Sequence, residues 1–242
     1  MPENSRTSNC EPSSLISETA QASPPDYSET GIEVFGLLRH DLQNYFSVIL
    51  MSLELYHMKN DEKYLDKIAE ASYKSLDYLS RFKEVERYLY REIVPVPCSL
   101  LNAIEKAVFK FPNLSFSIEG EDGVVLGDRN LPAIFEFLFS NVSLYGNVNE
   151  PVQISISQSV DGSIRKCRID VTNYGDPIPE SIHSSLFYPG VKGPESTGFG
   201  LGLYLSKVMA LRYGGDLVLK ETTPEKTTLS LILPFSDDDS GI

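Results

Sequence analysis

Cysteine is scarce in this sequence: Cys10, Cys98 and Cys167 are the three in 242 residues. They are far apart, odd in number and without the spacing of a metal site. Such a pattern argues against a disulfide framework and indicates a reducing compartment. We therefore expect a cytoplasmic protein.

Positive charge is also in short supply. The chain carries 21 Lys and Arg against 34 Asp and Glu, so its net charge is −13 and its pI is near 4.7. A surface of this sign repels polyphosphate backbones, so we expect no nucleic-acid partner. With 41% hydrophobic and 23% charged residues, the composition is that of a soluble globular protein. The length allows about one or two domains.

A hydrophobic run long enough to cross a membrane is missing. The most apolar stretch, FSVILMSLELY at residues 46–56, contains serines and Glu54. It falls short of the roughly 18 residues that a membrane span needs. The opening residues, MPENSRTSNCEPSS, lack the apolar core of a signal peptide. We expect neither a membrane anchor nor a membrane partner.

The first part of the chain predicts a helical hairpin after a disordered tail. Residues 1–30 are rich in Ser, Pro, Glu and Thr and cannot bury enough apolar surface to fold. Over 31–92, apolar residues recur every three or four positions on both sides of a turn near KNDEK, which is typical of two amphipathic helices. The expected seams are Phe35, Leu38, Leu42, Tyr45 or Phe46, Ile49, Leu53 and Tyr56, then Leu65, Ile68, Ser72, Leu76, Leu79 and Phe82. Because one hairpin leaves much of the seam exposed, we expect a homodimer in which two hairpins form a four-helix bundle.

Beyond residue 92 the pattern changes from helical to mixed. The segment IVPVPC, residues 93–98, contains two prolines and is the expected linker. From 99 to 235, helix-like and strand-like stretches mix without the strict alternation of a parallel sheet, which predicts an α+β sandwich with one sheet backed by helices. Residues 236–242 form the expected acidic tail. The expected helices are 99–110, 131–145 and 202–213, and the expected strands lie at 114–120, 123–127, 152–160, 165–173, 216–221 and 227–234.

Glycines at alternate positions stand directly before the last predicted helix: Gly198, Gly200 and Gly202 in TGFGLGLYLSKVMALRYGG. Glycine lets the backbone adopt a positive φ and approach a bulky anion closely. The helix that follows turns free N–H groups toward that anion, which suits phosphate. A glycine-rich turn is weak evidence alone, because an ordinary helix entry also uses one.

Three further segments precede this one in order: FEFLFSNVSLYGN, DVTNYGDPIP and LFYPGVKGPES. Together with RHDLQN at residues 39–44, they resemble the sensor histidine kinases over residues 31–235. The hairpin is similar to that family's dimerisation and phosphoacceptor domain, and the rest to its Bergerat-type ATP-binding domain. The resemblance implies an α+β protein in which a helical hairpin, forming a dimeric four-helix bundle, precedes a Bergerat-type α/β sandwich.

The resemblance also implies roles for residues of the second half. Asn141 matches the asparagine that holds Mg²⁺ against the phosphates of ATP, and Tyr145 matches an aromatic near the adenine. Lys192 matches a basic residue of the loop over ATP, and Thr228 a threonine near the adenine. The full expected nucleotide-binding set is Asn141, Tyr145, Asn173, Gly175, Ile178, Lys192, Gly198, Gly200, Leu201, Gly202, Leu203 and Thr228.

Three positions depart from the family pattern. Asn173 stands where the family usually has an aspartate that accepts a hydrogen bond from adenine. An amide oxygen still accepts that bond, but without charge assistance, so ATP would bind more weakly. Pro177 replaces a common glycine and stiffens the turn, and Leu144 removes a phosphate contact. These departures leave open a domain that no longer binds ATP.

His40 lies in the stretch GLLRHDLQNYFSVI. At 100° per residue it is about 200° around the helix from Leu38 on the seam, so its imidazole is expected to point outward. Neutral imidazole is a nucleophile near neutral pH. The resemblance makes His40 the phosphate acceptor, Asp41 its general base, and Asn44 the residue that orients water for phosphatase activity. The other two histidines are expected to be surface or structural residues: His57 and His183.

These expectations define one hypothesis and two rivals. The hypothesis is a sensor-type histidine kinase in which ATP phosphorylates His40, and His40 passes the phosphoryl group to an aspartate of a response regulator. The first rival is a phosphorelay histidine phosphotransferase whose nucleotide domain does not bind ATP. The second is a non-enzymatic, ATP-gated binding module similar to anti-sigma factors. For Asp41 and Asn44, the alternative is that both are merely solvated polar residues of a helix.

Overall fold

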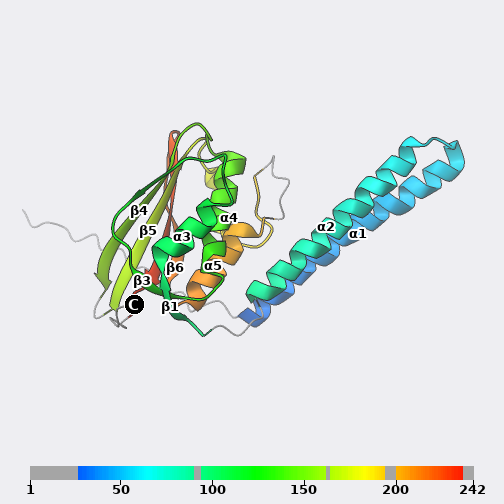
Figure 1. The fold of residues 1–242 in the computed structure, drawn as a ribbon. Coiled ribbons are helices and arrows are strands. Elements are labelled where there is room, and N and C mark those ends of the chain that lie inside the picture. Colours follow the sequence, from blue (N-terminus) through cyan, green and yellow to red (C-terminus); the bar gives the residue numbers. More distant parts are fainter. Residues whose placement is uncertain (1–26, 90–93, 162–163, 194–199, 237–242) are drawn as a thin grey trace, which may run out of the picture.

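The computed structural model describes residues 27–89, 94–161, 164–193 and 200–236. The expected disordered tail up to residue 26, and the expected acidic tail beyond Ser236, lie outside the described residues. The described chain forms two parts, a long helical hairpin and an α/β sandwich (Figure 1). This architecture confirms the predicted α+β fold.

Two antiparallel helices make up the hairpin: α1, Tyr27–Lys59, and α2, Lys63–Leu89. α1 begins before the predicted start at residue 31, since extending an existing helix by one turn costs little. At the turn, Asn60 has a left-handed φ of 47°, and the Asp61 carboxylate accepts a hydrogen bond from the backbone N–H of Lys63 at 3.1 Å. The stretch KNDEK therefore ends one helix and begins the next, as predicted.

The two helices of the hairpin pack through one face of each. The buried positions of α2 are Tyr64, Ala71, Ser75, Tyr78, Phe82 and Val85. Expected seam residues such as Leu65, Leu76 and Leu79 instead remain 41–63% exposed in the single chain. On α1, Phe46 and Leu53 are exposed as well. A second apolar face therefore runs along the hairpin, and the dimeric bundle that would cover it stays a prediction.

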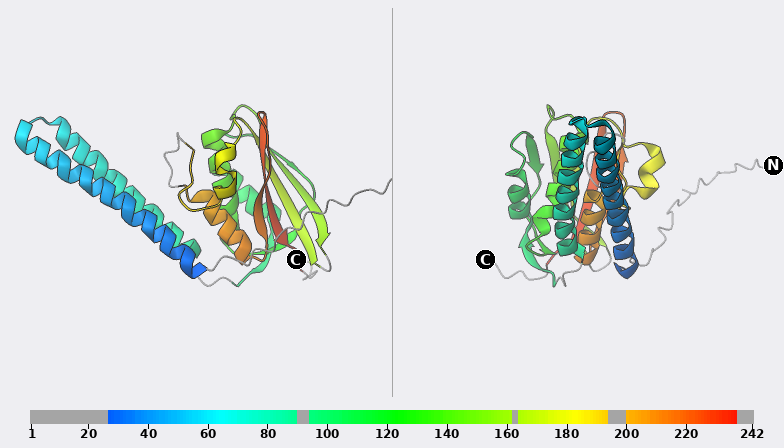
Figure 2. Two further views of the ribbon diagram at one scale, coloured as in Figure 1. Left: turned by 180° about the vertical axis from the view of Figure 1, so that it is seen from behind. Right: turned by 90° about the vertical axis from the view of Figure 1, so that its right-hand side faces the viewer.

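The sandwich contains a five-stranded sheet in the order β2-β4-β5-β7-β6, with three helices on one face (Figures 1 and 2). β2 pairs in parallel with β4, and the other neighbours are antiparallel. The strands are β2 Phe116–Glu119, β4 Val152–Asp161, β5 Ile164–Tyr174, β6 Asp216–Thr222 and β7 Lys226–Pro234. The helices are α3 Leu100–Val108, α4 Leu131–Tyr145 and α5 Gly202–Arg212, with a short 3₁₀ helix at Glu180–Ser185.

The expected linker at 93–98 is partly a strand. β1, Val96–Ser99, pairs with β3, Val124–Gly127, in a separate two-stranded antiparallel ribbon. Pro97 has no backbone N–H to donate, and it is tolerated because residues at the edge of a ribbon need not all donate a hydrogen bond to a partner strand. The pairing of two such short strands has no distinct sequence signal, since the partner strand lies some thirty residues further along the chain.

The main core lies between the sheet and its helices. Alternate residues of β5, among them Cys167, Ile169 and Val171, are buried on the helix-facing side. Phe135 and Phe139 of α4 are fully buried against that side. Truncating a buried phenylalanine of this kind to alanine costs about 3–5 kcal/mol. This packing holds α4 firmly, and with it the residues at its C-terminal end.

A second, smaller apolar cluster joins the hairpin to the sandwich. Its buried members are Val34, Phe82 and Val85 of the hairpin and Tyr204, Leu205 and Val208 of α5. Arg212 at the end of α5 donates hydrogen bonds from Nη1 to the carbonyl oxygens of Tyr88 and Leu89, at 2.5 and 3.2 Å. These are the last carbonyls of α2, where a cation is favourable. α5 thus packs against the base of the hairpin (Figure 2).

Candidate active site

His40 projects from α1 with 70% of its side chain exposed, which confirms the predicted outward orientation. Its Nδ1 lies 3.0 Å from Oδ1 of the adjacent Asp41. The Nδ2 of Asn44, one helical turn further on, lies 3.4 Å from the same Nδ1. The predicted group of His40, Asp41 and Asn44 is therefore brought together, and Asp41 reaches the imidazole directly.

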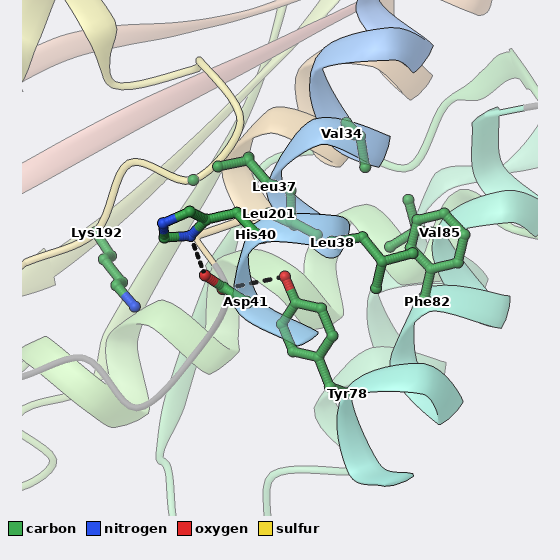
Figure 3. Close-up of a pocket in the computed structure, with 11 residues that line it drawn as sticks. Val34, Leu37, Leu38, His40, Asp41, Tyr78, Phe82, Val85, Lys192 and Leu201 are labelled. Atoms are coloured by element: carbon green, nitrogen blue, oxygen red, sulfur yellow. Dashed lines mark hydrogen bonds and ion pairs between the residues drawn. The ribbon is translucent and has the colours of Figure 1, made fainter. Parts of the chain in front are cut away.

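Asp41 is held by a residue that the sequence did not reveal. The phenolic hydroxyl of Tyr78, on α2, donates a hydrogen bond to Asp41 Oδ2 at 3.1 Å (Figure 3). Tyr78 is only 6% exposed, and its ring meets the Tyr45 ring edge-on at 6.3 Å between centroids. Burial, and next the neighbouring Asp41 carboxylate, raise the pKa of Tyr78 far above its ordinary value, so its hydroxyl stays a donor.

The shorter contact of His40 indicates which of its nitrogens carries the proton. An ionised carboxylate can only accept hydrogen bonds, so the 3.0 Å contact with Asp41 is a hydrogen bond when Nδ1 is protonated. In the neutral ring the lone pair then resides on Nε2. The Nδ2 of Asn44, at 3.4 Å, cannot donate to a protonated Nδ1, but the amide lies beside the ring and can orient a water molecule there. The arrangement is an exposed imidazole with a carboxylate against one of its nitrogens, which suits a nucleophile.

A cavity of about 240 Å³ lies next to His40, between the hairpin and the sandwich. Its polar wall includes His40, Asp41 and Lys192, and Gly190 and Leu201 come from the loop that leads into α5 (Figure 3). The remaining lining residues are Val34, Leu37, Leu38, Tyr78, Phe82 and Val85. The two halves of the chain therefore face each other at the histidine.

The loop leading into α5 is closed at its base by two glycines. The N–H of Gly190 donates to the carbonyl oxygen of Gly200 at 3.1 Å. Gly200 has a φ of +65°, and a Cβ there would lie 2.5 Å from the carbonyl oxygen of Val191, so no other residue fits. The predicted phosphate-binding Gly198 lies outside the described residues, whereas Gly202 begins α5 as expected.

The C-terminal end of α4 meets the end of β5. Gly146 and Gly175 form an isolated antiparallel bridge, and a Cβ on Gly175, at φ +146°, would lie 2.8 Å from the Tyr145 carbonyl oxygen. A Cβ on Gly193 would lie 3.2 Å from the Tyr145 ring. The structure thus gathers three predicted parts of the nucleotide site: the end of α4, the turn after β5 and the loop that bears Lys192.

Asn141 carries an unsatisfied group next to this region. Its Nδ2 is buried and has no hydrogen-bond partner among the described residues. A buried N–H donor without a partner is costly, and an oxygen of a bound phosphate would satisfy it. The side-chain oxygen of asparagine is also a ligand that Mg²⁺ accepts. The residues present therefore fit a bound phosphate–metal group on α4.

The two threonines of β7 lie on opposite faces of the sheet. Thr227 is the cross-strand neighbour of Asn173, so both lie on the helix-facing side. The predicted Thr228 instead lies opposite Thr172, and the two hydroxyls are 2.8 Å apart on the other face. Strand alternation separates Thr228 from Asn173, and Thr227 takes its place beside the predicted adenine acceptor. The period-two alternation of the strand could have indicated this.

The remaining predicted residues serve the surrounding framework. The Ile178 N–H donates to the Thr222 hydroxyl at 3.0 Å, and His183 Nε2 contacts the Ile178 carbonyl oxygen at 2.8 Å. His183 therefore has the structural role expected for it, since it holds the turn after Pro177. Leu203 packs against the main core. His57 is exposed near the end of α1.

Comparison with known proteins finds a family match in the second half of the chain. Residues 128–237 match the family described as histidine kinase-, DNA gyrase B-, and HSP90-like ATPase. No helix among the described residues is both long and apolar enough to cross a membrane.

Curated relatives include two bacterial sensor proteins. The sensory histidine kinase/phosphatase NtrB of Vibrio alginolyticus is 37% identical over 68 residues, which are 28% of this chain and 19% of NtrB. The sensor protein VanSC of Enterococcus gallinarum is 26% identical over 171 residues, which are 64% of this chain and 46% of VanSC. The chain thus spans less than half the length of each.

Solved structures share the fold over both parts of the chain. The Acinetobacter baumannii histidine kinase AdeS has a TM-score of 0.54 at 14% identity, over 83% of this chain and 98% of that one. Histidine kinase ThkA, in complex with response regulator protein TrrA, has a TM-score of 0.59 at 20% identity, over 88% of this chain and 65% of that one. At these identities the likeness shows the fold alone.

Proposed function

Because residues 128–237 match the histidine kinase-, DNA gyrase B-, and HSP90-like ATPase family, we propose that the protein is a protein-histidine kinase that phosphorylates His40 from Mg·ATP. The observation that carries this proposal is the cavity that His40 and Asp41 share with Gly190, Lys192 and Leu201. A nucleotide held by the loop and α5 would present its terminal phosphate toward this cavity.

The chemistry at His40 follows from its hydrogen bonds. Nε2 attacks the γ-phosphorus in line, the bond from that phosphorus to the β,γ-bridging oxygen breaks, and ADP leaves. The ring gains positive charge as the N–P bond forms. Asp41, already in contact with Nδ1, stabilises this charge and takes up the Nδ1 proton.

Residues of the sandwich supply binding and charge neutralisation. In this proposal the free N–H groups at the start of α5, after Gly200, face the phosphates, and Lys192 neutralises charge from the loop. Asn141 is the residue we assign to Mg²⁺, which would neutralise phosphate charge when bound. Tyr145, Asn173 and Thr227 would surround the adenine.

The wider proposal concerns partners and the reverse reaction. The complex of ThkA with TrrA supports a response regulator as the acceptor of the phosphoryl group. Asn44, 3.4 Å from His40, supports a phosphatase activity through an oriented water molecule. The exposed apolar face along Leu65, Leu76 and Leu79 supports a homodimer. The cysteine pattern supports a cytoplasmic location.

A phosphorelay phosphotransferase without ATP binding is the alternative. It is favoured by Asn173, which offers adenine an uncharged acceptor, and by Leu144, which is 54% exposed where a basic residue could have met phosphate. In that case His40 would receive its phosphoryl group from another protein. The same geometry at His40 would serve both activities.

Incubation with γ-labelled ATP and Mg²⁺ tests the proposal. The wild-type protein should gain an acid-labile, base-stable label, and His40→Gln should not, while both bind ATP equally. His57→Gln, at an exposed histidine of the same helix, should label normally. If the wild type neither binds nucleotide nor takes up label, the phosphotransferase alternative replaces the kinase. Nucleotide binding without label would indicate a binding module.

A further inference from the structure

We propose that Tyr78 is a positioning residue for the phosphoacceptor: by holding Asp41 from the facing helix, it keeps the Nδ1 proton of His40 in place and leaves Nε2 free to react. This inference rests on the proposed function of His40. It assigns a role to a residue of α2, and Tyr78 is the one polar residue that the described side chains of this helix contribute to the cavity lining beside His40.

Three side chains form a continuous hydrogen-bonded relay. The Tyr78 hydroxyl donates to Asp41 Oδ2 at 3.1 Å, and Asp41 Oδ1 lies 3.0 Å from His40 Nδ1. Both carboxylate oxygens of Asp41 are thus engaged, one inside the hairpin and one at its surface. Figure 3 shows Asp41 between the phenol and the imidazole.

Asp41 needs a second contact to keep this orientation. Consecutive residues of a helix point about 100° apart, so the carboxylate reaches His40 only in particular rotamers. Its side chain is 37% exposed, and water would otherwise compete for both oxygens. A hydrogen bond from a buried donor to one oxygen fixes the other one against Nδ1.

The environment of Tyr78 suits a fixed donor. Its side chain is almost fully buried, and its ring packs edge-on against Tyr45. The pKa of its hydroxyl is raised first by burial and then by the Asp41 carboxylate, so the group remains protonated in any physiological buffer. Since Tyr78 and Asp41 lie on different helices, the relay also requires the observed register of α1 against α2.

Tyr78→Phe removes the hydroxyl and keeps the ring. The readout is the tautomer of His40, measured by ¹⁵N NMR of histidine-labelled full-length protein. The Nδ1–H form should predominate in the wild type, and its ratio to the Nε2–H form should fall at least threefold in Tyr78→Phe. Tyr45→Phe, which removes a neighbouring hydroxyl that does not contact Asp41, should leave the ratio unchanged. An unchanged ratio in a folded Tyr78→Phe protein overturns the proposal.

Phosphorylation by phosphoramidate provides a rate that does not depend on ATP binding. Tyr78→Phe should slow the labelling of His40 by about tenfold. In an Asp41→Ala background the same substitution should have no further effect, because the relay is already broken. If the two substitutions instead slow the labelling additively, the proposal is overturned, because Tyr78 would then act independently of Asp41.

A further measurement needs no variant at Tyr78. The hydroxyl proton of Tyr78 should exchange slowly with solvent in the wild type and at least tenfold faster in Asp41→Ala. Equal exchange in the two proteins contradicts the relay. If the wild type takes no label from ATP but these results hold, the kinase proposal fails while the relay stands.

Discussion

Replacing Asn173 with aspartate would change how the protein reads the base of its nucleotide. Asn173 is half-buried at the end of β5, on the same face as Thr227. Its side-chain amide lies against Gly146, where an added Cβ would be 3.3 Å from Asn173 Nδ2. An amide both donates and accepts, so it suits the amino group of adenine and the carbonyl group of guanine alike. A carboxylate only accepts. We therefore expect Asn173→Asp to bind ATP more tightly and GTP more weakly.

The expected gain in ATP affinity follows from the charge that the new carboxylate brings. A net hydrogen bond to a charged group contributes about 1.5–3 kcal/mol, against about 0.5–1.5 kcal/mol for a neutral one. A gain of about 1 kcal/mol corresponds to roughly fivefold tighter ATP binding. The new carboxylate would stand beside Gly146, at the negative end of α4, which costs about 0.3–1 kcal/mol. The ligand-free variant should therefore melt about 1–3 °C lower than the wild type.

Isothermal titration of ATP and GTP in the presence of Mg²⁺ checks this prediction. Asn147→Asp is the matched control, because it adds the same charge in an exposed loop where Asn147 accepts a hydrogen bond from the Asn149 N–H. That variant should not gain affinity for ATP. If Asn173→Asp binds ATP no better than the wild type, or gains equally for GTP, then Asn173 does not face the base.

Two more predictions concern the joint between the parts and the buried thiol. Arg212→Met removes the donors that hold the last carbonyls of α2, so amide hydrogen exchange in that turn should accelerate about tenfold. Lys207 contacts Asp216 within the sandwich, so the control Lys207→Met should leave this exchange unchanged. Equal exchange in wild type and Arg212→Met would show that the apolar cluster alone joins the parts. Burial raises the pKa of the Cys167 thiol to about 11 from its ordinary value near 9. The unfolded chain therefore ionises first, and as pH rises from 9 to 11 the free energy of unfolding should fall by about 2 kcal/mol from this group. In chemical denaturation, the free energy of unfolding of Cys167→Ala should fall less between pH 9 and 11 than that of the wild type. If both proteins lose the same amount, groups other than Cys167 cause the loss.

Much of this protein was determined by local patterns in its sequence. The helix expected at 131–145 begins and ends at those residues, because a proline near its start and a glycine after its end mark the boundaries. The outward direction of His40 followed from its angle to Leu38, since helical geometry is the same in every helix. The glycine-rich entry to α5 was predictable because a positive φ, as at Gly200, has few alternatives to glycine.

The tertiary structure alone decided which distant residues meet. Tyr78 reaches Asp41 because of the register between two helices, and no spacing within either helix encodes that register. The pairing of β5 with β7 put Thr227, rather than Thr228, beside Asn173. The cavity at His40 exists because α5 packs against the base of the hairpin. Periodicity specifies which face of an element is apolar, but the partner of that face is chosen by packing over the whole chain.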